Sequence, residues 1–130
     1  MSEKRLLQAA VAIAGLVPVL GGALGALRPE LLDLAGPPHA LTHAAYLSGL
    51  LLGLGLGFWS LVPAIETRGR GFSLLTGLVV LGGLFRALAA ARLGAWGLSV
   101  ILPLVMELGV TPALWLWQRR VARSSISRPE

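Results

Sequence analysis

The sequence has no cysteine and few charged residues, since only 13% of its 130 positions are Asp, Glu, Lys or Arg. The absence of cysteine excludes disulfides, thiol redox chemistry and thiolate-bound metals, including quinone reduction through a CxxC pair. Soluble globular domains carry about 25% charged residues. With 55% hydrophobic residues and a mean hydropathy of +0.78, the chain is therefore predicted to be an integral membrane protein.

Four long apolar runs are present, each close to the ~20 residues that a helix needs to cross a bilayer. They occupy residues 6–27, 41–63, 72–91 and 98–117. We predict an all-α, integral membrane four-helix bundle over residues 1–118 and a basic cytoplasmic tail over 119–130. The first run could instead be a signal sequence, because a basic start precedes it and small residues follow, but signal cores span only ~7–15 residues.

The basic residues are distributed unequally between the two sides that four spans would create. One side would hold eight of them and the other two, Arg28 and Arg92. The eight are Lys4, Arg5, Arg68, Arg70, Arg119, Arg120, Arg123 and Arg128. By the positive-inside rule, both termini are predicted to be cytoplasmic. Because these residues flank apolar runs instead of forming a patch, they indicate orientation and contact with membrane lipids, and no nucleic-acid partner.

Glycines recur at helical spacing in two of the spans. Gly49, Gly53 and Gly57 share one strip of the second span with Tyr46 and Ser60. Such small-residue strips allow helices to approach closely, as in a glycine zipper. We expect packing within the chain in preference to a dimer seam. The further glycines predicted at helix contacts are Gly21, Gly25, Gly82 and Gly83.

Two charged residues, Arg86 and Glu107, lie inside spans, where each alone would cost on the order of 3 kcal/mol. At ~1.5 Å per residue, Arg86 lies about 9 Å and Glu107 about 14 Å below the same membrane face. An arginine side chain can cover that difference, so we predict that the two residues pair. The pair could fix helix register or form a ligand or proton site; alternatively, Arg86 could extend to the interface without meeting Glu107.

Other polar side chains could join this candidate intramembrane site. His43 and Tyr46 lie near the same end of the second span, and Thr111 shares a helix face with Glu107. His43 has no expected metal partner, because His39 is expected to lie across a short loop and no Asp, Glu or Cys accompanies His43 at ligand spacing. No serine outside the tail has a histidine at hydrogen-bond spacing. The sequence therefore indicates no metal, no cofactor and no catalytic residues, and it favours a protein that is not an enzyme.

Two segments resemble a small bacterial four-transmembrane-helix family of unknown function that is grouped with the DoxX-like proteins. They are YLSGLLLGLGLGFWSLVPAIE in the second span and MELGVTPALWLWQRRVAR in the fourth, and the RLLQAAVAIAGLVPVLGG start fits the same family. The sequence departs from the family where Ala44 follows His43 in place of an arginine. The resemblance implies a bundle in the bacterial inner (cytoplasmic) membrane, and some DoxX relatives suggest quinone-linked redox assemblies.

Three functional hypotheses follow. The first is a non-enzymatic bundle that binds a lipid-like molecule or serves as an accessory subunit, as a homo-oligomer or in a larger membrane complex. The second is a quinone-linked redox subunit or enzyme in which Glu107 transfers protons, assisted by Arg86 and His43. The third, a proton-coupled transporter, requires oligomerisation because the chain is short. The lack of catalytic residues favours the first.

Overall fold

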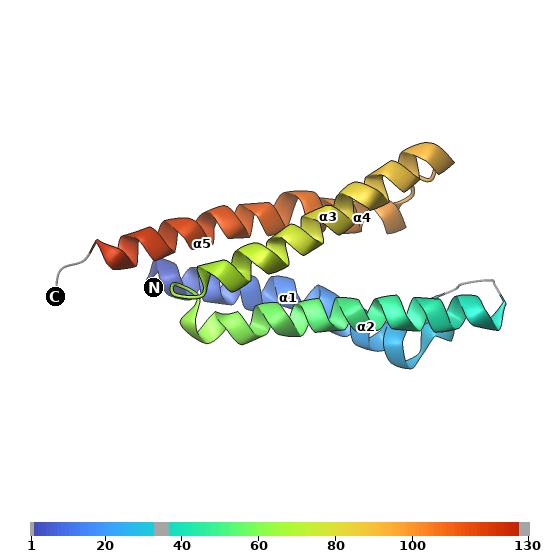
Figure 1. The fold of residues 1–130 in the computed structure, drawn as a ribbon, viewed down its shortest axis with the longest axis horizontal. Helices are drawn as coiled ribbons and strands as arrows, with labels where there is room; N and C mark the ends of the chain where they lie inside the picture. The colour runs from blue at the N-terminus through green and yellow to red at the C-terminus, as the bar shows by residue number, and fades with distance from the viewer. Residues whose placement is uncertain (1, 33–36, 128–130) are drawn as a thin grey trace. The chain divides into compact units, whose positions relative to one another are not determined.

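A computed structural model describes residues 2–32 and 37–127 of the chain, and the described residues form helices and short connections (Figure 1). In order, the elements are α1 (Glu3–Leu27), η1 (Pro29–Leu32), α2 (Pro38–Leu61), η2 (Val62–Ala64), α3 (Gly69–Leu93), α4 (Leu98–Val105), the π-helical turn η3 (Met106–Val110) and α5 (Thr111–Ile126). The prediction of an all-α chain is confirmed.

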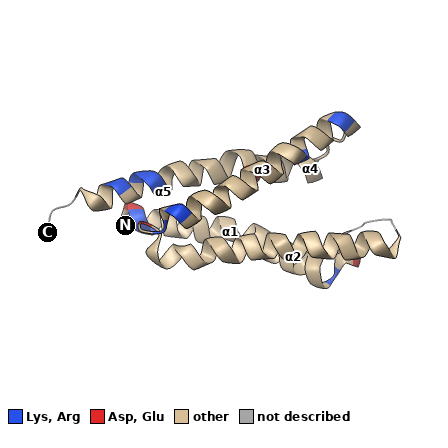
Figure 2. Cartoon of the chain, in the orientation of Figure 1, with Lys and Arg blue, Asp and Glu red and all other residues tan. Residues whose placement is uncertain are grey.

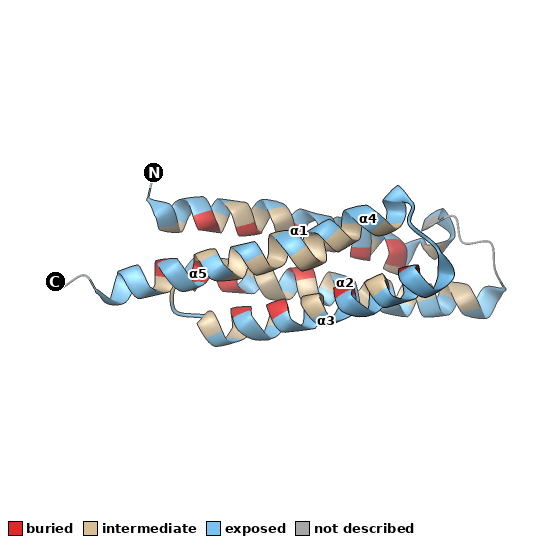
Figure 3. Ribbon diagram, turned by 90° about the horizontal axis from the view of Figure 1, so that it is seen from above, coloured by how far each residue is buried: buried red, intermediate tan, exposed pale blue. Residues whose placement is uncertain are grey.

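Four helical segments are long and apolar enough to cross a membrane: Glu3–Leu27, Pro38–Ala64, Gly69–Leu93 and Leu98–Ile126. Most of their surface is exposed and apolar, with Ile13, Leu74 and Leu98 all more than 60% accessible (Figure 3). A contiguous apolar surface of this kind is typical of a membrane-embedded protein. Four candidate membrane spans are thus present, as predicted.

The chain divides into two compact units, where the sequence predicted a single bundle. The α1–α2 unit comprises Gln8–Pro63, and the α3–α5 unit comprises Met1–Leu7 with Ala64–Glu130. The first turn of α1 therefore belongs with α3 and α5. Each unit has its own set of polar contacts between helices.

In the α1–α2 unit, α1 and α2 approach closely at glycines. A Cβ added to Gly22 would lie 2.5 Å from the backbone nitrogen of Leu52, and one on Gly55 would lie 2.7 Å from a Val19 methyl carbon. The indole nitrogen of Trp59 donates a 3.0 Å hydrogen bond to the carbonyl of Ala12. These contacts depend on small residues, because side chains there would separate the two backbones.

The glycines at this contact are not those expected from the sequence. Gly21, Gly49 and Gly53 have no atom of the α1–α2 unit within 4 Å of an added Cβ. The reason is geometric: the contacting face of α1 contains Gly22, one residue and hence about 100° from Gly21. These three glycines therefore do not form the contact between α1 and α2, and a packing role for them elsewhere stays a prediction. Gly25 is buried, as a packing glycine would be.

The α3–α5 unit is held together at one end by buried and polar contacts. Leu7, Ile65 and Phe72 are at most 1% exposed. Gln118, equally buried, donates a 2.8 Å hydrogen bond to the carbonyl of Ile65. The ammonium of Lys4 bonds Glu66 at 2.7 Å, so the start of α1 is tied to the connection before α3.

The last span is not one regular helix. It consists of α4, η3 and α5, and α5 continues to Ile126, through most of the segment expected to be a tail. No proline or glycine interrupts residues 113–127, and Arg and Ala are good helix formers, which explains the extension. Residues 128–130, including Arg128, lie outside the described part of the chain.

Basic side chains concentrate at one end of the α3–α5 unit (Figure 2). Lys4 and Arg5 begin α1, Arg68 and Arg70 flank the start of α3, and three arginines lie in α5. Arg92 lies near the other end of α3, where Gly94 stops the helix with a left-handed backbone (φ 65°). The unit therefore has a strongly basic end and an opposite end with a single arginine on α3.

Candidate functional site

Arg86 and Glu107 form an ion pair in the α3–α5 unit. The Arg86 Nη2 lies 2.9 Å from Glu107 Oε1, and Nε lies 3.0 Å from Oε2. Two parallel bonds of this kind are the strong, orientation-specific way for a guanidinium to bind a carboxylate. Both residues are inside candidate spans, so the pair predicted from their depths is present in the structure.

A close approach of two backbones makes this pair possible. A Cβ added to Gly83, one turn before Arg86 on α3, would lie 2.9 Å from Glu107 Cβ and 2.9 Å from a Leu108 methyl carbon. Gly83 therefore lies at a helix contact, as predicted. Gly82, predicted with it, has no atom of its unit within 4 Å of an added Cβ, because it is on the adjacent, outward face of α3.

Glu107 lies in the π-helical turn η3. Pro112, which directly follows Thr111, has no N–H to offer the carbonyl of Leu108. The Thr111 N–H instead bonds the Met106 carbonyl, five residues back, and the Thr111 hydroxyl bonds the same oxygen at 2.8 Å. The last span therefore contains a π turn at Glu107, a feature that is frequent at functional sites.

Thr111 therefore has a backbone role in the structure. Its hydroxyl is directed to Met106 and not to the carboxylate of Glu107. His43 and Tyr46 lie on α2 in the α1–α2 unit, and both are exposed. They remain predicted members of the site.

The pair is asymmetric in its exposure. The Glu107 side chain is 17% accessible and that of Arg86 is 43% accessible. The Nη1 nitrogen of Arg86 donates to no acceptor among residues 2–32 and 37–127, and a guanidinium edge points its donors outward in a fixed plane. The pair thus has no net charge but retains free hydrogen-bond donors at membrane depth.

Two side-chain bonds that support this unit were not predicted from the sequence. Trp115 Nε1 donates to Ser73 Oγ at 2.8 Å, and Gln118 donates to the carbonyl of Ile65. Both donors are in α5, at the end of the predicted fourth span. Their spacing of three residues, which places both on one helix face, was the available indication.

No group of three or more His, Cys, Asp or Glu side chains that could hold a metal ion occurs in the described ranges. The paired groups of the site are one guanidinium and one carboxylate. Such a pair can donate hydrogen bonds to an acceptor oxygen, or exchange a proton if Glu107 becomes protonated.

Comparison with curated proteins and with solved structures gave no match. A model of one protein family, described as a domain of unknown function (DUF4345), matches residues 6–118. The match runs from α1 into α5 and includes both Arg86 and Glu107. The chain therefore belongs to the DUF4345 family.

Proposed function

We propose that this protein is a non-enzymatic, multi-pass membrane protein that binds a lipid-like molecule at the Arg86–Glu107 pair. The observation that carries the proposal is the free Nη1 edge of Arg86 beside a carboxylate that already neutralises the charge. A neutral site with outward donors suits an uncharged acceptor, such as an ester or quinone carbonyl oxygen. Intramembrane ionisable residues are candidates for function because their insertion is costly.

The proposal includes location and orientation. The basic end of the α3–α5 unit supports a cytoplasmic position for both termini, because Lys and Arg are enriched on that side. The motif resemblance supports a relationship to DoxX-like proteins and a bacterial inner-membrane location. Membrane lipids are the expected surroundings, and a homo-oligomer or a larger complex is the expected assembly.

Native mass spectrometry of the detergent-purified full chain tests the site. Wild type is compared with Arg86→Leu/Glu107→Leu, and with the control Lys4→Met/Glu66→Met, which removes the Lys4–Glu66 ion pair and leaves Arg86 and Glu107 intact. We expect an additional small mass on wild type and on the control, and its loss in the first variant. A bare chain in all three, at equal stability, contradicts the proposal and leaves the pair a packing element.

A redox or proton-transfer role is the second candidate, favoured by the π turn at Glu107. It predicts that Glu107→Gln, which keeps hydrogen-bonding capacity but cannot release a proton, leaves folding intact and abolishes the reduction of an added quinone analogue to its quinol, in an assay where a supplied reductant gives the two electrons and Glu107 passes the protons. Unchanged reduction in this variant, or no reduction by wild type, excludes the role for Glu107.

A further inference from the structure

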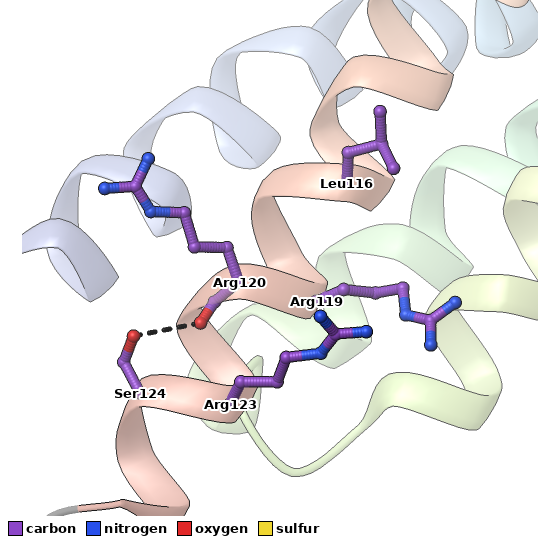
Figure 4. A pocket seen from close by; sticks show the side chains of 5 residues that line it. All are labelled: Leu116, Arg119, Arg120, Arg123 and Ser124. Atoms are coloured by element: carbon purple, nitrogen blue, oxygen red, sulfur yellow. Dashed lines mark hydrogen bonds between the residues drawn. The ribbon is translucent and has the colours of Figure 1, made fainter.

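A hollow of about 300 Å³ lies against the C-terminal half of α5 and is lined by Leu116, Arg119, Arg120, Arg123 and Ser124 (Figure 4). Arg119 and Arg123 extend to the same side of the helix, and Arg120 extends to the opposite side (Figure 4). The Ser124 hydroxyl is occupied by the carbonyl of Arg120. The hollow therefore presents two guanidinium groups four residues apart.

Within residues 2–32 and 37–127, these two arginines have no acidic partner. Arg120 pairs with Glu3 at 3.2 Å, whereas no carboxylate of the described residues pairs with Arg119 or Arg123. Like charges four residues apart destabilise a helix. An anion between the two guanidinium groups would remove that repulsion.

Arg119 is held in place with its donors available. Its guanidinium carbon lies 5.0 Å from the ring centroid of Trp115, and the Trp115 indole is fixed by its bond to Ser73. A guanidinium stacked on a ring uses its face, so the N–H groups at its edge stay free for an acceptor. Ordering a side chain before binding reduces the entropic cost of binding.

The hollow lies where the helix would leave the membrane. At ~1.5 Å per residue, Leu98–Ile126 is about 43 Å long, and the apolar layer of a bilayer is about 30 Å thick. Counted from Leu98, the apolar part ends near Trp117, and Trp115 and Trp117 are typical interface residues. Arg119 and Arg123 then lie at the level of lipid headgroups, with Leu116 on the membrane side.

We propose that Arg119 and Arg123 bind the phosphate of an anionic glycerophospholipid whose acyl chains pass Leu116. Arginine binds phosphate oxygens through two parallel N–H bonds. The neighbouring hollow, of about 530 Å³, contains Glu3, Leu6, Leu116, Trp117 and Arg120. Its cation is already paired with Glu3, so the Arg119–Arg123 hollow is the one that selects an anionic lipid. This site is separate from the Arg86–Glu107 pair, and either proposal can fail alone.

The test is native mass spectrometry of the full chain titrated with phosphatidylglycerol and, separately, phosphatidylcholine. We expect Arg119→Gln/Arg123→Gln to weaken the binding of the first phosphatidylglycerol molecule by about tenfold or more. The affinity for phosphatidylcholine should stay unchanged. The matched control, Arg68→Gln/Arg70→Gln, removes the same charge from the same end of the unit and should change the affinity less than about twofold. Thermal unfolding verifies that each variant is folded. If the double variant does not fold, the single variant Arg123→Gln replaces it, because it leaves the contact between Arg119 and Trp115 intact. This variant should still weaken phosphatidylglycerol binding by about threefold.

Three results would overturn the proposal. Equal weakening by the two double variants would show that only general charge attracts the lipid. Full affinity in Arg119→Lys/Arg123→Lys would show that the planar guanidinium groups are not needed. Inorganic phosphate that binds as tightly as phosphatidylglycerol, and with the same sensitivity to Arg119→Gln/Arg123→Gln, would identify the ligand as free phosphate.

Discussion

Gln118 and Ile65 lie 53 residues apart in the chain, and the Gln118 side-chain amide donates a 2.8 Å hydrogen bond to the Ile65 carbonyl. Both residues are almost completely buried. The bond holds the connection between α2 and α3 against α5. It does so between η2 and the start of α3, at the basic end of the unit.

Gln118→Met should therefore destabilise the protein by about 1–3 kcal/mol, since the substitution keeps the side-chain volume but leaves the Ile65 carbonyl unpaired in the interior. Reversible unfolding in mixed detergent micelles measures the effect. Thr42→Val, which removes an exposed hydroxyl that bonds only the His39 carbonyl, is the control and should have little effect. Equal stability of Gln118→Met and wild type would mean that water replaces the amide.

The Arg86–Glu107 pair should show strong coupling in a double-mutant cycle. Either Arg86→Leu or Glu107→Leu alone leaves one charge without its partner at membrane depth, and we expect a loss of about 3 kcal/mol in each. The double variant should be more stable than either single variant, because it leaves no unpaired charge. Additive losses in the same unfolding assay would show that the two residues do not interact in the membrane.

Glu66 should make stability depend on acidity. The hydrogen bond from the Lys4 ammonium, followed by a bond from its own backbone N–H, lowers the pKa of Glu66 below its ordinary value. A carboxylate whose pKa is lower in the folded state than in the unfolded state stabilises the folded state at pH values above its unfolded-state pKa. This stabilisation is lost as the pH falls through the folded-state pKa. Because Lys4 is 41% exposed, we expect only about 0.5 kcal/mol. Lys4→Met should flatten the stability curve between about pH 5 and pH 3, and an unchanged curve would contradict this origin.

Gly83 and Gly82 form a matched pair for testing the contact between α3 and η3. Gly83→Ala would place a carbon 2.9 Å from Glu107 Cβ, and separation of the helices should cost about 1–3 kcal/mol. Gly82→Ala meets no atom of its unit within 4 Å and should be neutral or slightly stabilising, since alanine favours helix. Similar stabilities of the two variants would show that this contact is looser than the structure indicates.

The number of spans and the Arg86–Glu107 pair could be predicted because they follow from local composition and helical rise alone. Apolar run length determined the spans, and the cost of an unpaired charge in lipid made the partner of Arg86 predictable. The sequence did not identify Gly22 as the glycine of α1 that meets α2; it indicated the neighbouring Gly21 as a packing residue. Helical spacing alone does not distinguish faces that differ by a single position when small residues are abundant on both.

The site on α5 was missed for a different reason. Arg119 and Arg123 were attributed to membrane orientation because the helix was expected to end near Trp117. Only the continuation of the helix to Ile126 places them on one face, and only tertiary structure shows that Glu3 neutralises Arg120 and not its neighbours. Charge counts along a sequence do not reveal which cations remain unpaired.

The π turn at Glu107 also bears on how this chain tolerates changes of length. A π turn has one more residue than the α-helical turn it replaces. Removing Gly109, whose added Cβ would meet nothing within 4 Å in its unit, would restore regular α-helical bonding between Met106 and Thr111. The helix faces before and after the turn would keep their partners on α3. Insertions and deletions in the last span are therefore expected to concentrate at residues 106–110, where the family can gain or lose one position without rotating α5.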